Sequence, residues 1–491
     1  MSNLLTDTLE QARLTARALV EFGDGLINPT LRLGVTGMSG AGKTVFLTAL
    51  VNALTAGGRF PVFEALASGR LARARLAPQP DDDIPRFEYE RHLRALTDAR
   101  QWPESTRQIS ELRLVIDYQS RNRALRTLTL DIVDYPGEWL LDLPLLTTDY
   151  DDWSRETLAL AQRHPRAAVS APWRTHLATM DPLAPADELA VVTSAELFTA
   201  YLRACRDERY AMSMLPPGRF LMPGDLAGSP ALTFAPLALP DGGDAPKGSV
   251  WAMMRRRFEA YKSVVVRPFF REHFARLDRQ IVVVDALAAF NAGPEALRDL
   301  EGALASILAC FRVGRRTILG SMFNPKIEKI LFAATKADHL HHINHDRLES
   351  IVRRMVMRAA ERAEFAGSEV DVIALAAVRA TREATVRRNG ESLATIVGVP
   401  AAGQTLGSET FDGEAEVALF PGDLPADAET LFDQAGRSAF QGLSDTTAQE
   451  ADYRFLKLRP PKIPRDGDGS VILPHIRLDR ALQFLMGDRL Q

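Results

Sequence analysis

Short apolar runs alternate with longer stretches of helical periodicity along most of this chain. The apolar runs predict strands at residues 31–36, 109–118, 125–133, 281–285, 330–334 and 370–376. Apolar positions at helical spacing predict helices at residues 44–55, 250–277, 294–311 and 345–363. This alternation indicates an α/β fold with a doubly wound, mostly parallel sheet.

One pair of predicted strands departs from the parallel arrangement. Residues 109–118 and 125–133 are joined only by residues 119–124 (QSRNRA), whereas a parallel crossover needs about a dozen residues or more. We therefore expect these two runs to form a hairpin, which places one antiparallel strand in the sheet.

Changes in composition divide the chain into a core and additions. We expect an N-terminal helix at residues 1–27 and a C-terminal extension of short strands and turns at 381–491, ending in an amphipathic helix near 478–486. Residues 57–103 are polar, and residues 140–261 join helical stretches to a segment dense in Pro and Gly, so both predict insertions. The remaining segments form the expected core, which comprises residues 28–56, 104–139 and 262–380.

Composition excludes few classes of function. The net charge of -4 over 491 residues disfavours a dedicated nucleic-acid binder, so no nucleic-acid partner is expected. Cys205 and Cys310 lack metal-type spacing and fit a reducing cytoplasm. No run approaches the ~18 consecutive apolar residues of a membrane span. We expect a cytoplasmic protein without a transmembrane segment, either free or peripheral to a membrane.

The clearest chemical signal is the loop at residues 37–44 (GMSGAGKT), which fits G-x-x-x-x-G-K-[ST] between a predicted strand and a predicted helix. In such a P-loop, backbone N–H groups face one phosphate and the helix adds its positive dipole end. Lys43 is expected to reach the β- and γ-phosphates, and Thr44 to bind Mg²⁺. The expected nucleotide contacts here are Gly37, Ser39, Gly40, Ala41, Gly42, Lys43, Thr44 and Val45.

A second signal follows the strand at residues 125–133, where the sequence reads Asp134-Tyr135-Pro136-Gly137. Asp134 ends an apolar strand, where a carboxylate can hold Mg²⁺. Gly137 has the spacing by which GTPases bring a glycine N–H to the γ-phosphate. Asp131 is a competing carboxylate, but it lies inside the strand.

A third signal, Thr335-Lys336-Ala337-Asp338, comes directly after the predicted strand at residues 330–334. Asp338 can accept hydrogen bonds from guanine N1–H and the 2-amino group, and adenine lacks that pair of donors. The stem of Lys336 would pack on the base. Ala377 and Val378 follow the last predicted strand, where a backbone N–H would meet the guanine carbonyl.

Other candidate residues rest on weaker patterns. Thr106 precedes the hairpin and is our candidate second Mg²⁺ ligand; Ser105 is the alternative, and a simple strand cap is nearly as well supported. Arg100 and Arg107 flank this segment and are candidates for a charge-stabilising arginine, although ordinary surface positions are favoured for both.

Four histidines, His339, His341, His342 and His345, follow the third motif. They look like a metal cluster, but no carboxylate or cysteine stands at a supporting spacing. Metal binding by these histidines is therefore disfavoured.

The order of the motifs resembles that of the Ras-like, translation-factor-related GTPases, and the hairpin matches that class. More specifically, the chain resembles the bacterial YcjX family of stress-linked GTPases over nearly its whole length. The resemblance is carried by residues 37–44, 102–103 (WP), 134–140 (DYPGEWL), 217–220 (PGRF), 261–269 and 278–285. It implies a Ras-like P-loop core with helical insertions that binds GTP and GDP with Mg²⁺. It also suggests a stress-response setting and a membrane-linked protein effector.

The residue after Gly137 is Glu138, where Ras itself has a water-orienting glutamine. A carboxylate can orient or deprotonate water, but it repels the γ-phosphate. We therefore expect slow GTP hydrolysis, with Lys43, Thr106, Gly137 and Glu138 as the catalytic candidates.

Three functions are compatible with these patterns. The favoured one is a GTPase that hydrolyses GTP to GDP and phosphate and acts as a nucleotide-dependent switch. One alternative is a P-loop kinase for a small molecule, with residues 140–248 as its lid. The other is a nucleotide-gated scaffold with negligible turnover.

Overall fold

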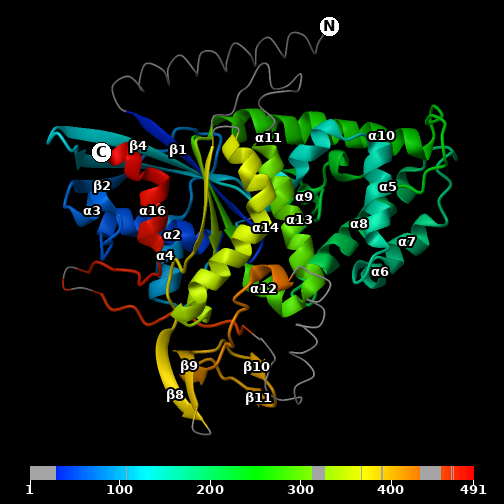
Figure 1. Cartoon of the computed structure of the whole chain (residues 1–491). Coiled ribbons are helices and arrows are strands. Elements are labelled where there is room, and N and C mark those ends of the chain that lie inside the picture. Colours follow the sequence, from blue (N-terminus) through cyan, green and yellow to red (C-terminus); the bar gives the residue numbers. More distant parts are fainter. Residues whose placement is uncertain are drawn as a thin grey trace.

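The computed structural model describes residues 29–106, 108–311, 327–365, 368–388, 391–431, 455–465, 467 and 469–491. The expected N-terminal helix at residues 1–27 lies outside the described residues. The described chain forms a central sheet covered by helices, with a group of helices beside the sheet and smaller strands below it (Figure 1).

The central sheet contains seven strands in the described part of the chain, in the order β2-β3-β4-β1-β5-β6-β7. These strands are β1 (Thr30–Gly37), β2 (Leu71–Ala77), β3 (Ser110–Gln119), β4 (Leu125–Asp134), β5 (Arg279–Val284), β6 (Lys329–Ala334) and β7 (Glu369–Ala374). The pairs β4-β1, β1-β5, β5-β6 and β6-β7 are parallel, whereas β3 is antiparallel to both of its neighbours. The mostly parallel sheet with one antiparallel strand is therefore confirmed.

The edge strand β2 was not predicted, because it comes from the polar stretch at residues 57–103. Its sequence LARARLA places exposed arginines at Arg73 and Arg75, and of its residues only Ala74 is buried. Arg75 pairs with Asp117 on β3 at 2.8 Å. Charged side chains are common on edge strands, where they discourage pairing with another chain. Because of these arginines, residues 71–77 contain no apolar run from which a strand could be predicted.

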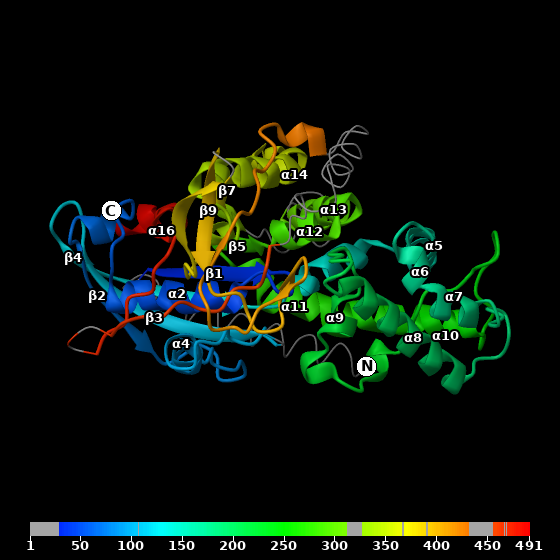
Figure 2. The same ribbon diagram turned by 90° about the horizontal axis from the view of Figure 1, so that it is seen from below.

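Side-chain alternation along the central strands separates two hydrophobic clusters on the two faces of the sheet. Ile281 and Val283 of β5 belong to one cluster, and Val282 and Val284 belong to the other. The first face packs against α2 (Lys43–Ala56), α3 (Glu64–Ala67), α4 (Tyr89–Thr97) and α16 (Leu478–Met486). The second packs against α12 (Ala286–Ala292), α13 (Pro294–Cys310) and α14 (His345–Phe365). Figure 2 shows α2 and α13 on opposite sides of β1, so the predicted double winding is confirmed.

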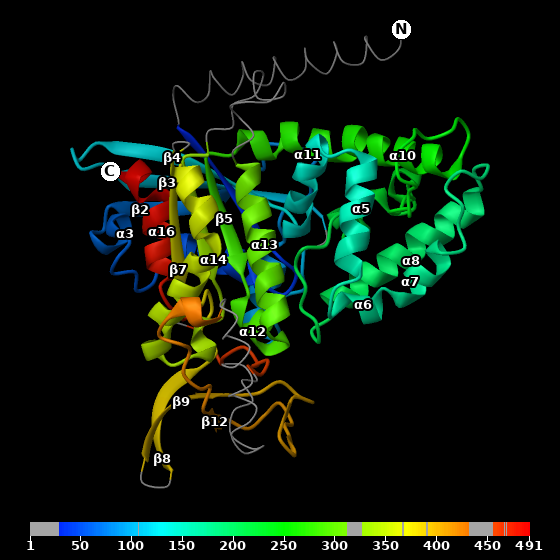
Figure 3. The same ribbon diagram turned by 45° about the vertical axis from the view of Figure 1, so that its right-hand side comes forward.

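The helical insertion lies beside the sheet (Figures 1 and 3). It consists of α5 (Tyr150–Ala161), α6 (Arg166–Val169), α7 (Ala171–Leu177), α8 (Glu188–Arg206), α9 (Gly218–Leu221) and α10 (Val250–Tyr261). Buried aromatic residues fill its interior; Trp153, for example, stacks on Phe258 with ring centroids 5.0 Å apart. These rings belong to the same hydrophobic cluster as Phe332 of β6. The insertion and one face of the sheet therefore share a continuous core.

The long helix expected at residues 250–277 is interrupted. After α10, the π-helix η4 (Lys262–Val266) precedes α11 (Arg267–Glu272), and a short turn η5 (Phe274–Arg276) follows. Pro268 lacks an N–H group, so it cannot continue the hydrogen-bond ladder of the preceding turn. Lys262 of the π-helix donates to the carbonyl of Thr148 at 3.0 Å, which fixes this break against the start of the insertion.

The C-terminal extension contains the expected short strands. β8 (Arg382–Arg388), β9 (Glu391–Gly398) and β12 (Val417–Leu419) form one antiparallel sheet, while β10 (Thr405–Leu406) pairs with β11 (Glu409–Thr410). The last helix, α16, matches the predicted residues 478–486. The short helical turns are η1 (Gly137–Thr147), η2 (Gly224–Leu226), η3 (Pro230–Leu232), η6 (Ala337–His339), η7 (His342–Asn344), η8 (Ala428–Leu431) and η9 (Gly487–Leu490). Among the described helices, none has the length and apolarity required to span a membrane.

Candidate functional site

The loop between β1 and α2 lies at the carboxyl end of the central strand of the sheet, where α/β proteins bind their ligands. Ser39 and Gly40 are exposed at its tip, whereas Gly37 and Ala41 are buried at its base. Gly42 adopts a φ of 85°, a conformation that favours glycine, and begins α2 without a side-chain cap. The first N–H groups of a helix have no partner inside that helix, so this terminus can bind an anion.

Four side chains from the predicted motifs meet beside this loop. Lys43 forms a buried ion pair with Asp134. The Thr106 hydroxyl donates to the other Asp134 oxygen at 2.8 Å. The hydroxyl oxygens of Thr44 and Thr106 are 3.3 Å apart. The structure therefore joins three segments that are distant in sequence into one group of two hydroxyls, one carboxylate and one ammonium.

The competing residues lie outside this group. Asp131 forms a bidentate pair with Arg113, at 2.6 and 2.8 Å, across β3 and β4. Ser105 is exposed, although its neighbour Glu104 accepts a hydrogen bond from the Thr44 hydroxyl through its carbonyl at 3.2 Å. Of the alternatives weighed from the sequence, Asp134 and Thr106 are the residues that converge on Thr44.

Gly137 and Glu138 lie directly against the P-loop. A Cβ atom at Gly137 would stand 2.7 Å from the carbonyl carbon of Gly37, so only glycine allows this approach. The Glu138 carboxylate accepts a hydrogen bond from the Ser39 N–H at 3.1 Å, and its second oxygen is buried without a hydrogen-bond partner. The acid thus occupies one of the N–H groups through which a P-loop binds phosphate.

The third motif contacts the P-loop from the other side. The Thr335 hydroxyl donates to the carbonyl of Ala41 at 2.8 Å, which couples the end of β6 to the P-loop. Lys336 adopts a left-handed φ of 60° and forms an ion pair with Asp285, the residue after β5. Asp285 was not predicted, although its position at the end of a buried strand could have indicated it.

Asp338 is buried with 4% of its surface exposed and faces the loop after β7. One of its carboxylate oxygens accepts the Ala380 N–H at 2.8 Å, and its carbonyl accepts the Thr381 hydroxyl at 2.6 Å. Ala377 and Val378 are buried in the same loop. The structure brings the two predicted guanine segments together, and the contact runs through Ala380, which the sequence analysis missed.

One of the two candidate arginines, Arg100, contacts the C-terminal extension rather than the predicted site. The Arg100 guanidinium donates to the carbonyl of Pro460 at 3.2 Å, and nearby Trp102 donates from its indole to Leu458 at 2.6 Å. Both contacts fasten the segment before Thr106 to the C-terminal extension. Arg107 lies outside the described residues.

The insertion holds the segment that follows Glu138. In η1, the buried Asp142 carboxylate accepts hydrogen bonds from the Tyr261 hydroxyl at 2.6 Å and the Gly218 N–H at 2.7 Å. The Arg219 guanidinium stacks on the Trp139 ring, 3.3 Å from its centroid. Elements α9 and α10 therefore contact η1 immediately after Gly137 and Glu138, the residues that contact the P-loop.

Burial raises the pKa of Asp142 to about 7, because the hydrogen bonds from Tyr261 and Gly218 only partly offset the loss of solvation. The unfolded chain loses this proton near the ordinary aspartate pKa of 3.8, whereas the folded chain keeps it to about pH 7. The corresponding stabilisation is full below about pH 4 and decreases as the pH rises to about 7. We expect Asp142→Asn, which cannot ionise, to show a smaller loss of unfolding free energy over this range.

Urea unfolding of both proteins at several pH values between 4 and 7 measures this difference. Burial also raises the pKa of Glu111 to about 7, which gives both proteins a decrease of the same sign. The relevant quantity is therefore the difference between the two curves. Parallel curves for the two proteins would contradict the role assigned to Asp142.

Comparison with known proteins identifies relatives over nearly the full chain. The model of the YcjX-like family, DUF463, matches residues 31–490. The chain is 40% identical over 492 residues to a protein of Escherichia coli (strain K12) named Ras-like GTPase YcjX, covering 96% of this chain and 98% of that protein. A protein of the same name from Shewanella oneidensis is 34% identical over 489 residues, covering 94% and 95%.

Proposed function

The chain belongs to the YcjX-like family, and from this membership and the geometry of the site we propose that it binds GTP and GDP with Mg²⁺, hydrolyses GTP to GDP and phosphate, and acts as a nucleotide-dependent switch. The two relatives named Ras-like GTPase support guanine-nucleotide binding in general terms. The hydrolysis, the metal and the roles of single residues are our proposal.

The observation that carries the proposal is the meeting of Thr44, Thr106 and Asp134 beside the P-loop. Mg²⁺ prefers oxygen ligands and is usually held by few protein groups together with phosphate oxygens and water. Two hydroxyls and one carboxylate fit this preference, so these three residues would hold the ion, directly or through water. When bound, Mg²⁺ neutralises negative charge on the phosphates.

Lys43 would then exchange partners. In the structure it is paired with Asp134, and both side chains are buried. Phosphate oxygens in the loop would compete for the ammonium, while the metal would compensate the carboxylate that the ammonium leaves. This exchange keeps each buried charge paired, as burial requires.

Selection of guanine is assigned to Asp338 and the loop after β7. A buried carboxylate that already accepts one N–H has further lone pairs for the N1–H and 2-amino groups of guanine. Adenine would leave those acceptors unpaired at the cost of a buried polar group. The hydrogen bond from the Thr335 hydroxyl to the Ala41 carbonyl supports this assignment, because it links the motif that contains Asp338 to the P-loop.

Glu138 supports a second candidate function, the nucleotide-gated scaffold. Its carboxylate lies at the Ser39 N–H, where its negative charge would oppose a γ-phosphate. Strong opposition would make turnover negligible and leave nucleotide-dependent binding of a protein effector as the function. A measurement of phosphate release from bound GTP separates the two candidates.

We expect the full chain to bind GTP and GDP much more tightly than ATP, and to release phosphate from GTP slowly with Mg²⁺ and not with excess EDTA. Competition against a fluorescent GDP measures the affinities, and a single-turnover assay with the protein in excess measures phosphate release. Equal affinities for GTP and ATP would contradict the guanine assignment. Nucleotide binding without phosphate release would favour the scaffold.

The cellular setting of this activity is proposed from the family resemblance. We infer that the switch acts in a stress response in the cytoplasm, through a protein effector that is associated with a membrane. We assign binding of the effector to the helical insertion, because the insertion contacts η1 directly after the proposed phosphate site and would move with it.

A further inference from the structure

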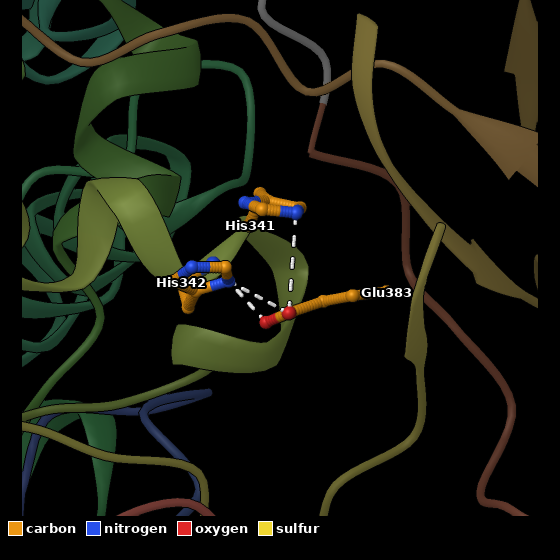
Figure 4. Close-up of side chains that lie close together, drawn as sticks. All are labelled: His341, His342 and Glu383. Atoms are coloured by element: carbon orange, nitrogen blue, oxygen red, sulfur yellow. Dashed lines mark hydrogen bonds and ion pairs between the residues drawn. The ribbon is translucent and has the colours of Figure 1, made fainter. Parts of the chain in front are cut away.

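Two adjacent histidines after the guanine motif face a glutamate from the C-terminal extension (Figure 4). His341 and His342 lie at the start of η7, and Glu383 lies on β8. The His342 Nδ1 is 2.7 Å from a Glu383 oxygen, and the His341 Nε2 is 3.9 Å from the same oxygen. Glu383 supplies the carboxylate whose absence from the local sequence disfavoured a metal site.

The three side chains have the chemistry of a transition-metal site. One ligand atom from each side chain lies within 4.8 Å of the other two. Among the described residues, this is the one group of three or more histidine, cysteine or acidic side chains with that spacing. Zn²⁺ is commonly held by histidine nitrogens and a carboxylate at about 2.0–2.2 Å, with water completing the coordination. Small side-chain shifts would bring the ligand atoms to these distances.

The exposure of the cluster also suits a metal ion. The His341 side chain is only 12% exposed, and its Nδ1 is buried without a hydrogen-bond partner. Because Nδ1 is buried, Nε2, which lies 3.9 Å from Glu383, is the nitrogen that an ion could reach. His342, by contrast, is 62% exposed, which leaves an entry path and room for water.

The cluster joins two segments that form the proposed base site. Thr381, two residues before Glu383, donates to the carbonyl of Asp338, and Ala380 donates to the Asp338 carboxylate. On the other side, His341 lies three residues after Asp338. An ion held by the cluster would tie η7 to β8 and so restrain the loop around Asp338.

We propose that His341, His342 and Glu383 bind a divalent transition-metal ion, with Zn²⁺ as the expected species. The bound ion would hold the loop around Asp338, here called the guanine loop, against the C-terminal extension. Binding of the ion is independent of the proposed function, whereas its effect on the guanine loop rests on it. The competing interpretation is a plain histidine–carboxylate pair, supported by Arg379, which lies 3.9 Å from Glu383.

Zn²⁺ titration of tag-free full chain, loaded with GDP and excess Mg²⁺ to occupy the nucleotide site, tests the proposal. Calorimetry is expected to give one Zn²⁺ per chain, and His342→Ala and Glu383→Gln are each expected to weaken its binding at least about tenfold. His164→Ala is the matched control, because it removes an exposed imidazole on the insertion and should leave Zn²⁺ binding unchanged.

Amide hydrogen exchange supplies the second readout. Zn²⁺ is expected to slow exchange at Ala380 in the native protein and in His164→Ala, but not in Glu383→Gln. Absence of Zn²⁺ binding to the native chain, or unchanged affinity in both cluster variants, would overturn the site. If Zn²⁺ binds through the cluster but leaves exchange at Ala380 unchanged, the coupling to the guanine loop is wrong. Failure of the chain to bind GDP would contradict the proposed function and leave the Zn²⁺ titration interpretable.

Discussion

Replacing Asp338 with asparagine is expected to lower the affinity for GTP and GDP by about a hundredfold or more and to raise the affinity for xanthine nucleotides. Each hydrogen bond to a charged group contributes about 1.5–3 kcal/mol, and two such bonds to guanine would be lost. The amide of asparagine would instead donate to the 2-carbonyl of xanthine. Competition against fluorescent GDP and XDP measures both changes.

The substitution should leave the fold intact, because the asparagine oxygen can still accept the Ala380 N–H. Asp346→Asn is the matched control. Asp346 is an exposed carboxylate at the start of α14 that pairs with Arg477 at 2.6 Å and does not touch the site. Retention of guanine preference in Asp338→Asn would remove Asp338 from the base site.

Replacing Glu138 with alanine is expected to slow GTP hydrolysis about a hundredfold without weakening GTP binding. A side chain that orients or deprotonates the attacking water typically contributes about 10²–10⁴-fold to the rate. Binding should be retained or improved, because alanine frees the Ser39 N–H and removes a buried negative charge beside the phosphate loop. Single-turnover phosphate release and competition binding separate the two effects.

Glu138→Gln is the matched variant for this measurement, since it keeps the size of the side chain and removes only its charge. If orientation of water is the main role, glutamine should hydrolyse GTP at least as fast as the native protein while binding it more tightly. If proton abstraction is the main role, glutamine should be as slow as alanine. Hydrolysis by Glu138→Ala at the native rate would exclude both roles.

The contacts of η1 give the proposed switch a structural route. Gly137 lies on the backbone of Gly37, and five residues later Asp142 is held by Tyr261 and Gly218 of the insertion. Because Gly137 packs so closely on Gly37 that no side chain fits between them, we expect a displacement of the P-loop to displace η1 as well. We therefore expect a rearrangement around the P-loop to shift α9 and α10 through the packed contacts of Asp142.

Much of the fold could be predicted from local patterns. The apolar run that became β5 and the loop between β1 and α2 need only their own residues, because strand burial and the glycine turn are local properties. The short link between β3 and β4 likewise left antiparallel pairing as the one arrangement that the chain length permits. β2 escaped prediction because exposed arginines cover an edge strand, and η4 escaped because helical periodicity continues through a π turn.

In the candidate site too, some residues could be predicted from local motifs and others could not. The sequence by itself predicted the P-loop at residues 37–44 and the candidate carboxylates Asp134 and Asp338, since each motif is contiguous and follows a recognisable strand. Only the tertiary structure decided that Thr106 rather than Ser105 meets Thr44, that Asp131 belongs to Arg113, and that Glu138 reaches the Ser39 N–H. It also brought Glu383 to His341 and His342. These outcomes depend on distances between segments far apart in the chain, which the packing of the sheet and its insertions sets and which no local pattern contains.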